Sequence, residues 1–338
     1  MKQRSFKNWL KMGAIAVIFT IFSTLSCSKS SQTSHFRGFA MKMPYHIAIV
    51  GPLTRHDKVV IKRIIEGTFQ ETDQISNHWN NRSELSYFNQ MRSTKNTNLS
   101  PSLRELLTLA AEIVRLSEGR YDPTLGPVID SWKTSLVQHR EPSHKTLVSL
   151  KRVVGWEHLT FTDNKIAKDI PELTLDLDSI AKGKCVDNIT TNLVEAGYEN
   201  VYVEWSGEIR THGNNEEKTP WAIEIFSPRS GPRDVIHLEN EAIATSGNYM
   251  QSWAVRSEDD GNVRIYSHLI NRKTLRSMEL QKKSILSVSV RAPTCALADG
   301  LATAAMLIET PEELIEWTNK IKNEIHGVTF WIVEKQVL

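Results

Sequence analysis

The stretch CALADGLATAAM, residues 295–306, contains the residue pair whose spacing points most directly to chemistry. Asp299 and Thr303 are four positions apart, so on a helix they lie one turn apart on the same face. A carboxylate and a hydroxyl placed in this way are hard oxygen ligands of the kind that Mg²⁺ prefers. The structural alternative is an aspartate that interacts with the helix dipole and a threonine that hydrogen-bonds to its own helix. The surrounding alanines favour the ligand interpretation, because small side chains leave room for a bulky group.

The segment LDLDSIAKG, residues 175–183, places charges where a strand is expected to run into a helix. The pattern LTLDL (173–177) is typical of a buried strand. Asp176 and Lys182 can both face the start of the following helix, where free N–H groups attract an anion. The alternative is a surface ion pair at an ordinary turn. Asp178 lies between the two, and the pattern assigns it no role.

The segment GRYDPTLGPVIDSW, residues 119–132, is expected to be a turn because it is dense in Pro and Gly. Its carboxylate, Asp122, follows an aromatic residue, a combination that suits a ring-shaped ligand. A plain connecting loop explains the composition equally well.

Two strand segments carry further candidates. In AIATSGNYM (242–250), hydroxyl and N–H groups that follow an apolar strand can face phosphates. These groups belong to Thr245, Ser246 and Gly247. In YSHLI (266–270), His268 is a lone histidine among alternating residues. Such a histidine is more often structural, but one that titrates near neutrality can act as a general base.

Composition and missing motifs narrow the function classes. The chain has 41 basic and 39 acidic residues, a net charge of +2 and no basic run in its body, so nothing indicates nucleic-acid binding. The common nucleotide and hydrolase signatures GxGxxG, GxxxxGK[ST], HExxH and GxSxG are absent. A phosphorylated ligand would therefore be bound by residues outside these motifs.

Hydrophobic periodicity predicts helices and strands that are interleaved without a regular βαβ repeat. The predicted helices cover 56–76, 102–119, the start of 144–178, 180–201, 295–308 and 311–321. The predicted strands are 43–51, the rest of 144–178, VYVEW, WAIEIF, AIATS, YSHLI, ILSVSVRA and 328–334. We therefore expect a mixed α+β fold rather than a doubly wound sheet.

The N-terminus has the layout of an export signal. A basic start is followed by a short apolar stretch that ends in TLSC, which resembles a bacterial lipobox although Thr24 replaces the usual Leu. We predict a signal peptide over 1–26, lipidation at Cys27, a polar tether over 27–37 and one functional domain over 38–338. A plain secretory signal is the alternative. The two remaining cysteines, Cys185 and Cys295, make neither a disulfide framework nor a metal motif.

In their order along the chain, these segments resemble the ApbE family, the FAD:protein FMN transferases. The family run G-x-x-D-x-T-x-G-P-L-V-x-x-W is matched by GRYDPTLGPVIDSW, and D-L-x-x-I-A-K-G-x-x-x-D by DLDSIAKGKCVD. A-I-A-T-S-G-x-Y is matched by AIATSGNY, A-D-x-x-A-T-A by ADGLATA, and S-H-I-I-D-P-x-T-G in part by SHLINRKTL. The resemblance spans roughly residues 38–310.

The resemblance implies an ApbE-type, T-fold-like α+β fold that holds FAD in a cleft between two lobes, with one Mg²⁺ at the pyrophosphate. It implies catalytic roles for His268 as the base and for Lys182 and Asp299. The implied Mg²⁺ ligands are Asp299, Thr303 and the backbone carbonyl of Ser179. The FAD contacts expected from the resemblance and from the phosphate-binding segment are Met41, Trp79, Arg120, Tyr121, Asp122, Asp176, Lys182, Thr245, Ser246, Gly247 and Ile270.

The chain departs from the family pattern at several places. Lys42 and Met43 replace the Gly-Thr of M-G-T, and Ser206 replaces a glycine of G-G-[DE]-I. After the histidine, Asn271, Arg272 and Leu275 replace Asp, Pro and Gly. Asp178 stands where a small residue is usual, and Ala302 where a third acidic ligand is frequent. These departures concern the fine contacts to flavin and metal.

The function expected from the resemblance is Mg²⁺-dependent transfer of FMN from FAD to a Ser or Thr hydroxyl, with release of AMP. Two alternatives stay open: hydrolysis of FAD to FMN and AMP, and flavin binding without catalysis. The implied acceptors are exported flavoproteins, such as subunits of Na⁺-translocating NADH:quinone reductase or related complexes. The expected location is the bacterial cell envelope, where a lipid on the inner or outer membrane would hold the domain facing the periplasm.

Overall fold

A seven-stranded sheet, antiparallel at every pairing, forms the framework of the domain. The structure is a computed structural model that describes residues 32–225, 234–248, 252–256, 261–281 and 284–334, all within one compact unit. Across the sheet the strands are β1 (Thr33–Ala40), β2 (Met43–Val50), β6 (Val201–Trp205), β7 (Glu208–His212), β10 (Ala242–Gly247), β14 (Ile285–Ala292) and β15 (Thr329–Glu334).

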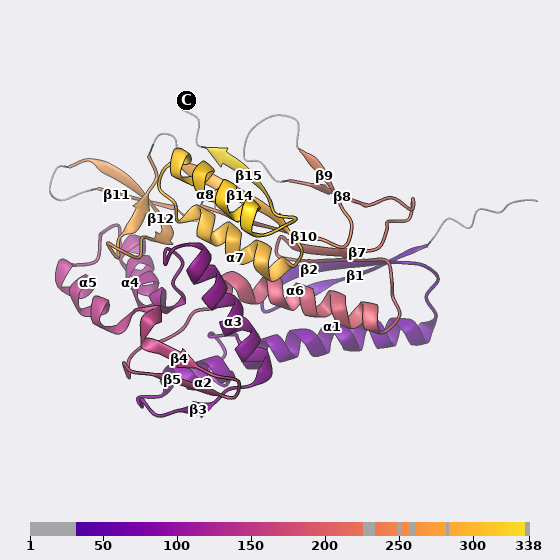
Figure 1. The fold of residues 1–338 in the computed structure, drawn as a ribbon, viewed down its shortest axis with the longest axis horizontal. Helices are drawn as coiled ribbons and strands as arrows, with labels where there is room; N and C mark the ends of the chain where they lie inside the picture. The colour runs from indigo at the N-terminus through magenta and orange to yellow at the C-terminus, as the bar shows by residue number, and fades with distance from the viewer. Residues whose placement is uncertain (1–31, 226–233, 249–251, 257–260, 282–283, 335–338) are drawn as a thin grey trace, which may run out of the picture. The chain divides into compact units, whose positions relative to one another are not determined.

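Helices cover one face of this sheet (Figure 1). Helix α6 packs on β6 and β7, and α7 packs on β10 and β14. The two helices also lie against each other, with α1 beside α6 and α3 across both. Their apolar faces and the inward residues of the sheet make the two largest hydrophobic clusters. The helices are α1 (Arg55–Ile75), α2 (Glu84–Gln90), α3 (Pro101–Leu116), α4 (Gly126–Val137), α5 (His144–Leu150), α6 (Asp178–Glu195), α7 (Cys295–Met306) and α8 (Pro311–Glu324).

Three smaller sheets complete the described chain. The hairpin of β8 (Trp221–Glu224) and β9 (Val235–Leu238) packs through its apolar residues on the side of the main sheet that carries Tyr202 and Ile209. A sheet of β11 (Ser252–Arg256), β12 (Val263–Ile270) and β13 (Ser277–Glu279) packs against α4. The third sheet and the 3₁₀ turns are β3 (Thr97–Asn98), β5 (Lys165–Lys168), β4 (Leu159–Phe161), η1 (Pro123–Leu125), η2 (Lys151–Val153) and η3 (Trp156–His158).

The expected mixed α+β class is confirmed, but the predicted strand over 173–177 is wrong. Leu173, Leu175 and Leu177 are buried as expected, yet no strand pairs with them in the described chain. The side chain of Asn89 replaces the missing ladder: its Oδ1 accepts from Leu175 N (2.7 Å) and its Nδ2 donates to Leu175 O (2.8 Å). The alternating pattern therefore predicts correctly that the three leucines are buried. Its prediction that their backbone pairs with a neighbouring strand is wrong.

Two other segments differ from the sequence-based expectation. The second half of the predicted turn 119–132 is the start of α4, because a proline is favourable in a first helical turn. The polar tether predicted over 27–37 is already strand from Thr33 onward, since β1 pairs with β2 along its whole length. The predicted signal peptide and Cys27 lie outside the described residues.

No helix among the described residues has both the length and the apolar character that a membrane crossing requires. Cys185 and Cys295 are buried free thiols, so no disulfide links them.

Candidate functional site

Most of the residues singled out in the sequence meet in one cavity of about 420 Å³. The cavity is bounded by α6, α7, β10, β12 and the turn that precedes α4. Its lining includes Tyr121, Asp122, Asp176, Ser179, Lys182, Thr245, Ser246, Gly247, His268, Ile270, Asp299 and Thr303. These residues come from five separate segments of the chain, so the tertiary fold assembles a site that the sequence suggests only in pieces.

A buried carboxylate fixes α7 on α6 and so sets the position of Asp299. Asp187, on α6, accepts from Cys295 N (2.8 Å) and Ala296 N (2.9 Å) at the start of α7. Arg210 on β7 donates to the same carboxylate at 2.7 Å. A carboxylate at a helix N-terminus satisfies donors that the helix itself cannot pair. The aspartate that ends the DLDSIAKGKCVD motif is thus a cap rather than a ligand contact.

Lys182, Glu208 and Asp299 form a charge cluster in the cavity wall. The Lys182 ammonium donates to Glu208 Oε1 and lies 3.7 Å from Asp299 Oδ2, which also accepts from Gly183 N (3.2 Å). Burial alone would lower the pKa of Lys182, but the two carboxylates hold it above its ordinary value. Burial raises the pKa of Asp299 to about 8, although the lysine opposes this shift. When both carboxylates are ionised they share one ammonium, which leaves an excess of negative charge.

This cluster has the chemistry of a divalent cation site. Asp299 is 3% exposed, and Glu208 Oε2 is buried with no hydrogen-bond partner among the described residues. The Thr303 hydroxyl lies 3.2 Å from Ser246 Oγ at the same wall. Carboxylate and hydroxyl oxygens with uncompensated negative charge fit Mg²⁺, because a hard cation prefers oxygen ligands. The residues present therefore fit the metal that the resemblance implies.

Glu208 is a charged cavity residue that none of the sequence patterns singles out. In the sequence it belongs to the segment that matches G-G-[DE]-I, where Ser206 is the departure from the family. A signal was available: Glu208 and Arg210 alternate on β7, so both point to the face covered by α6. Charged residues at inward strand positions need partners. Here the partners are Lys182 and Asp187.

A second cavity, of about 700 Å³, shares Lys182 and Asp178 with the first. Met41 and Trp79 line it, as does the buried indole of Trp205. Trp79 is 74% exposed, so its ring is open to a ligand. An exposed aromatic ring beside a roomy cavity can stack on a flat ring system. The structure thus places two predicted flavin contacts in an adjoining space rather than in the charged cavity.

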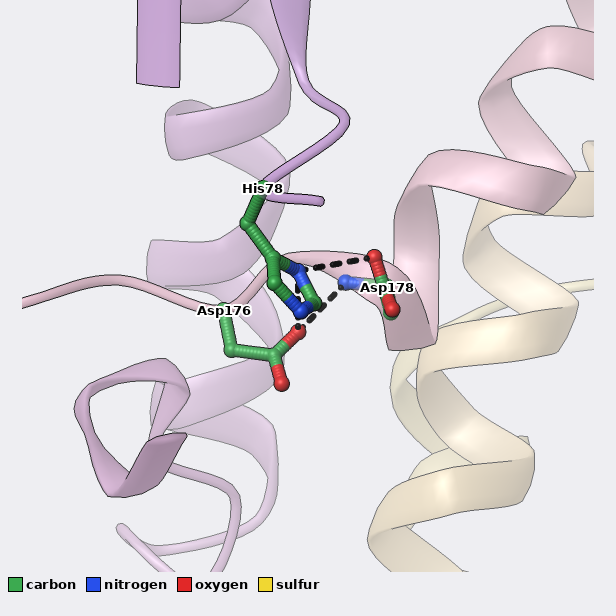
Figure 2. A group of neighbouring side chains, drawn as sticks. All are labelled: His78, Asp176 and Asp178. Carbon is green, nitrogen blue, oxygen red and sulfur yellow. Dashed lines mark hydrogen bonds and ion pairs between the residues drawn. The ribbon is translucent and has the colours of Figure 1, made fainter. Parts of the chain in front are cut away.

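Asp178, which the sequence left without a role, pairs with His78 (Figure 2). His78 Nδ1 lies 3.3 Å from Asp178 Oδ1 and 3.6 Å from Asp176 Oδ1. Burial alone would lower the pKa of His78, but the carboxylates of Asp178 and Asp176 beside it raise it. Burial and the Asp178 charge raise the pKa of Asp176. The cluster ties the loop after α1 to the start of α6.

Arg120 is the predicted contact that the structure does not bring to either cavity. Its guanidinium donates to Glu313 and lies 3.4 Å from Glu118 Oε2. It lines a third cavity, beside Arg272. The Asp122 carboxylate is also occupied within the protein, since it accepts from Thr124 and Arg272. Both residues therefore have local structural partners.

By its fold and the chemistry of its cavity, the protein is an α+β domain whose site suits a divalent cation and a phosphorylated ligand. The model of the ApbE family matches residues 41–329. The chain belongs to the ApbE family.

Similar proteins agree with this assignment along most of the chain. The chain is 34% identical over 296 residues to the FAD:protein FMN transferase of Chlamydia pneumoniae, covering 87% of this chain and 91% of the relative. It is 34% identical over 310 residues to that of Vibrio cholerae, with 89% and 88% covered. The solved structure of the flavin transferase ApbE from Vibrio cholerae superposes with a TM-score of 0.75 at 29% identity, covering 89% of this chain and 97% of that one.

Proposed function

We propose that this protein is an FAD:protein FMN transferase that uses Mg²⁺ and attaches FMN to a Ser or Thr hydroxyl through a phosphoester bond. The observation that carries the proposal is the single cavity in which Lys182, Asp299 and His268 meet from α6, α7 and β12. The relatives from Chlamydia pneumoniae and Vibrio cholerae are named FAD:protein FMN transferases, which supports the transfer part of the proposal.

The reaction assigns a separate task to each of these side chains. The acceptor hydroxyl oxygen attacks the FMN-side phosphorus of FAD while the bond from that phosphorus to the bridging oxygen breaks. AMP leaves with the bridging oxygen, and the hydroxyl proton passes to His268. The Lys182 ammonium offsets negative charge on the phosphates. Fixed charges of this kind stabilise a transition state well because they need not reorganise during reaction.

Three oxygen groups would hold the metal: the Asp299 carboxylate, the Thr303 hydroxyl and the Ser179 carbonyl. Bound Mg²⁺ supplies Lewis-acid stabilisation of the phosphate oxygens. Glu208 keeps Lys182 beside Asp299 through its ion pair. The neighbouring cavity with Trp79 would hold a flat ring of the dinucleotide.

The test is to incubate the purified mature chain with FAD and Mg²⁺, with and without an acceptor segment that bears the family's flavinylation motif. AMP release and covalent flavin on a denaturing gel are followed together. Release of AMP only when the acceptor is present, together with gel-bound flavin, is the expected result. Release of AMP without the acceptor would instead show that the protein hydrolyses FAD. Flavin binding without AMP release or covalent flavin would show that the protein binds flavin without catalysing transfer.

We also propose a setting for this activity. TLSC before a polar segment favours a lipid on Cys27 that holds the domain at the cell envelope, facing the periplasm. The acceptors would be exported flavoprotein subunits, such as those of Na⁺-translocating NADH:quinone reductase or related complexes. A hydroxyl acceptor on an exported protein would be within reach of a domain anchored on the same side of the membrane.

A further inference from the structure

Arg272 stands where the ApbE pattern has proline, two residues after the end of β12. Its Nε donates to Asp122 Oδ2 at 2.5 Å, and its Nη2 lies 3.3 Å from Glu157 Oε1. Arg272 is not among the described residues that line the main cavity, and it borders a neighbouring one. It can therefore affect the main site only through the groups that it holds.

The group that Arg272 holds most directly is the buried carboxylate of Asp122, which is 7% exposed. The other oxygen of this carboxylate accepts from Thr124 N (2.9 Å) and Thr124 Oγ1 (2.6 Å). The Thr124 hydroxyl in turn accepts from Gly155 N at 2.7 Å. Arg272 thus provides the charged partner of a buried carboxylate, and its loss would leave one carboxylate oxygen without that donor.

The turn around Asp122 supports two residues of the proposed site. Pro123 O accepts from Asp176 N at 2.7 Å. The buried hydroxyl of Tyr121 accepts from Ser179 Oγ at 3.0 Å. Asp176 and Ser179 are the residues expected to contact FAD and Mg²⁺ at the start of α6. The Asp176 backbone and the Ser179 side chain are therefore held by a turn whose own geometry depends on Asp122.

We propose that Arg272 is a positioning residue for FAD binding. It connects the strand that carries His268 and Ile270 to the turn 121–125, and through that turn to Asp176 and Ser179. The inference rests on the proposed function, since it concerns how the FAD site of that function is held. Small displacements of binding groups weaken a site strongly even when no direct contact is lost.

The test compares Arg272→Met, Arg272→Lys and a matched control, Arg276→Met. Arg276 makes a similar 2.5 Å ion pair, but its partner is Glu141 and not a residue of the turn. FAD affinity is measured by quenching of flavin fluorescence, with the melting temperature of each variant and, for transfer, KM and kcat separately. We expect Arg272→Met to weaken FAD binding about tenfold, Arg272→Lys to restore part of the loss, and Arg276→Met to stay within about twofold.

A double variant separates positioning from simple charge neutralisation. Asp122→Asn combined with Arg272→Met removes the buried charge together with its partner. We expect this pair to recover the melting temperature but not the FAD affinity. Unchanged FAD affinity in Arg272→Met, an equal loss in Arg276→Met, or full recovery of affinity in the double variant would each overturn the proposal. Because FAD affinity is the main readout, the result stands even if the wild-type protein transfers no FMN.

Discussion

The carboxylate of Asp299 has an unusual environment: it is buried beside both a lysine and a second carboxylate. Two buried carboxylates beside one lysine destabilise the folded protein when no cation is bound. A bound cation offsets the excess negative charge, so the same arrangement favours cation binding. The four-residue spacing of Asp299 and Thr303 predicts oxygen ligands on one helix face. The tertiary contacts add a second reason, because Glu208 and Asp299 outnumber the Lys182 ammonium when both are ionised.

Asp299→Ala should lower FMN transfer by at least about 100-fold at saturating FAD, because the proposed metal ligand and a fixed charge are lost together. The rate of covalent flavin formation over a Mg²⁺ titration measures the effect. The control is Asp163→Ala, since Asp163 is 95% exposed and pairs with Arg104 at the surface. Full transfer by Asp299→Ala at ordinary Mg²⁺ concentrations would refute the metal assignment.

His268→Ala tests the base. A positioned general base contributes about 10²–10⁴ in rate, so kcat for transfer should fall by that range while FAD affinity changes little. Single-turnover kinetics with excess enzyme separate the chemical step from binding. His237→Ala, on the outer hairpin, serves as control. If His268→Ala keeps its transfer rate, His268 is not the base, and charge stabilisation and positioning would explain catalysis.

At the scale of elements, the close contact of α6 and α7 depends on a glycine. A Cβ on Gly183 would lie 2.5 Å from Cys295 O and 2.7 Å from Ala296 N. The same residue donates its N–H to Asp299. The absence of a Cβ lets the helices approach, and the approach places the turn of α7 that carries Asp299 beside Lys182.

Gly183→Ala should therefore lower the free energy of unfolding by about 1–3 kcal/mol, because the two backbones must separate. It should also weaken FAD binding, because Asp299 moves with α7. Chemical denaturation and flavin fluorescence measure the two effects. Gly67→Ala is the matched control: a Cβ there meets nothing within 4 Å, and alanine favours a helix. Equal stability of the two variants would show that the helices can adjust.

A buried lysine gives a different element-level prediction. Lys168, on β5, is 1% exposed and donates to Leu173 O (2.7 Å) and Phe88 O (3.2 Å). Burial lowers its pKa to about 8. Between pH 8 and about 10.5 the unfolded chain keeps this proton while the folded chain releases it. The lysine's contribution therefore makes stability rise with pH in that window.

Lys168→Met should remove this rise. The difference in unfolding free energy between wild type and variant, measured by urea denaturation from pH 7 to 10.5, should change by on the order of 3 kcal/mol across the window. Taking this difference removes the contributions of other groups that titrate in the same pH range, because both proteins contain them. Lys165→Met on the same strand is the control, because Lys165 is exposed. A difference that stays constant with pH would mean that Lys168 keeps its charge when buried.

At the scale of the whole molecule, the lipid anchor proposed at Cys27 would precede the first strand by only a few residues. Cys27→Ala should therefore release the protein from membranes on cell fractionation without loss of FMN transfer by the purified protein. Ser28→Ala should stay membrane-bound. Cys27→Ala protein that remains in the membrane pellet would contradict the proposed lipid anchor.

The sequence by itself determined the local features of this protein. Helix α7 and the shared face of Asp299 and Thr303 follow from a periodicity that spans a few residues. The order of the motifs was enough to identify the family, because each motif is a short continuous run. Spacing within a helix or strand is dictated by backbone geometry, so it can be read without knowledge of the rest of the chain.

Only the tertiary structure decided which charges meet. Glu208 pairs with Lys182 across 26 positions, and Arg272 with Asp122 across 150. His78 pairs with Asp178 although 100 positions separate them. Leu175 bonds to an asparagine side chain where its pattern predicted a strand neighbour. Each of these groups has many possible partners in the sequence, and the packing of distant elements selects one because a buried polar group must be satisfied where the fold leaves it.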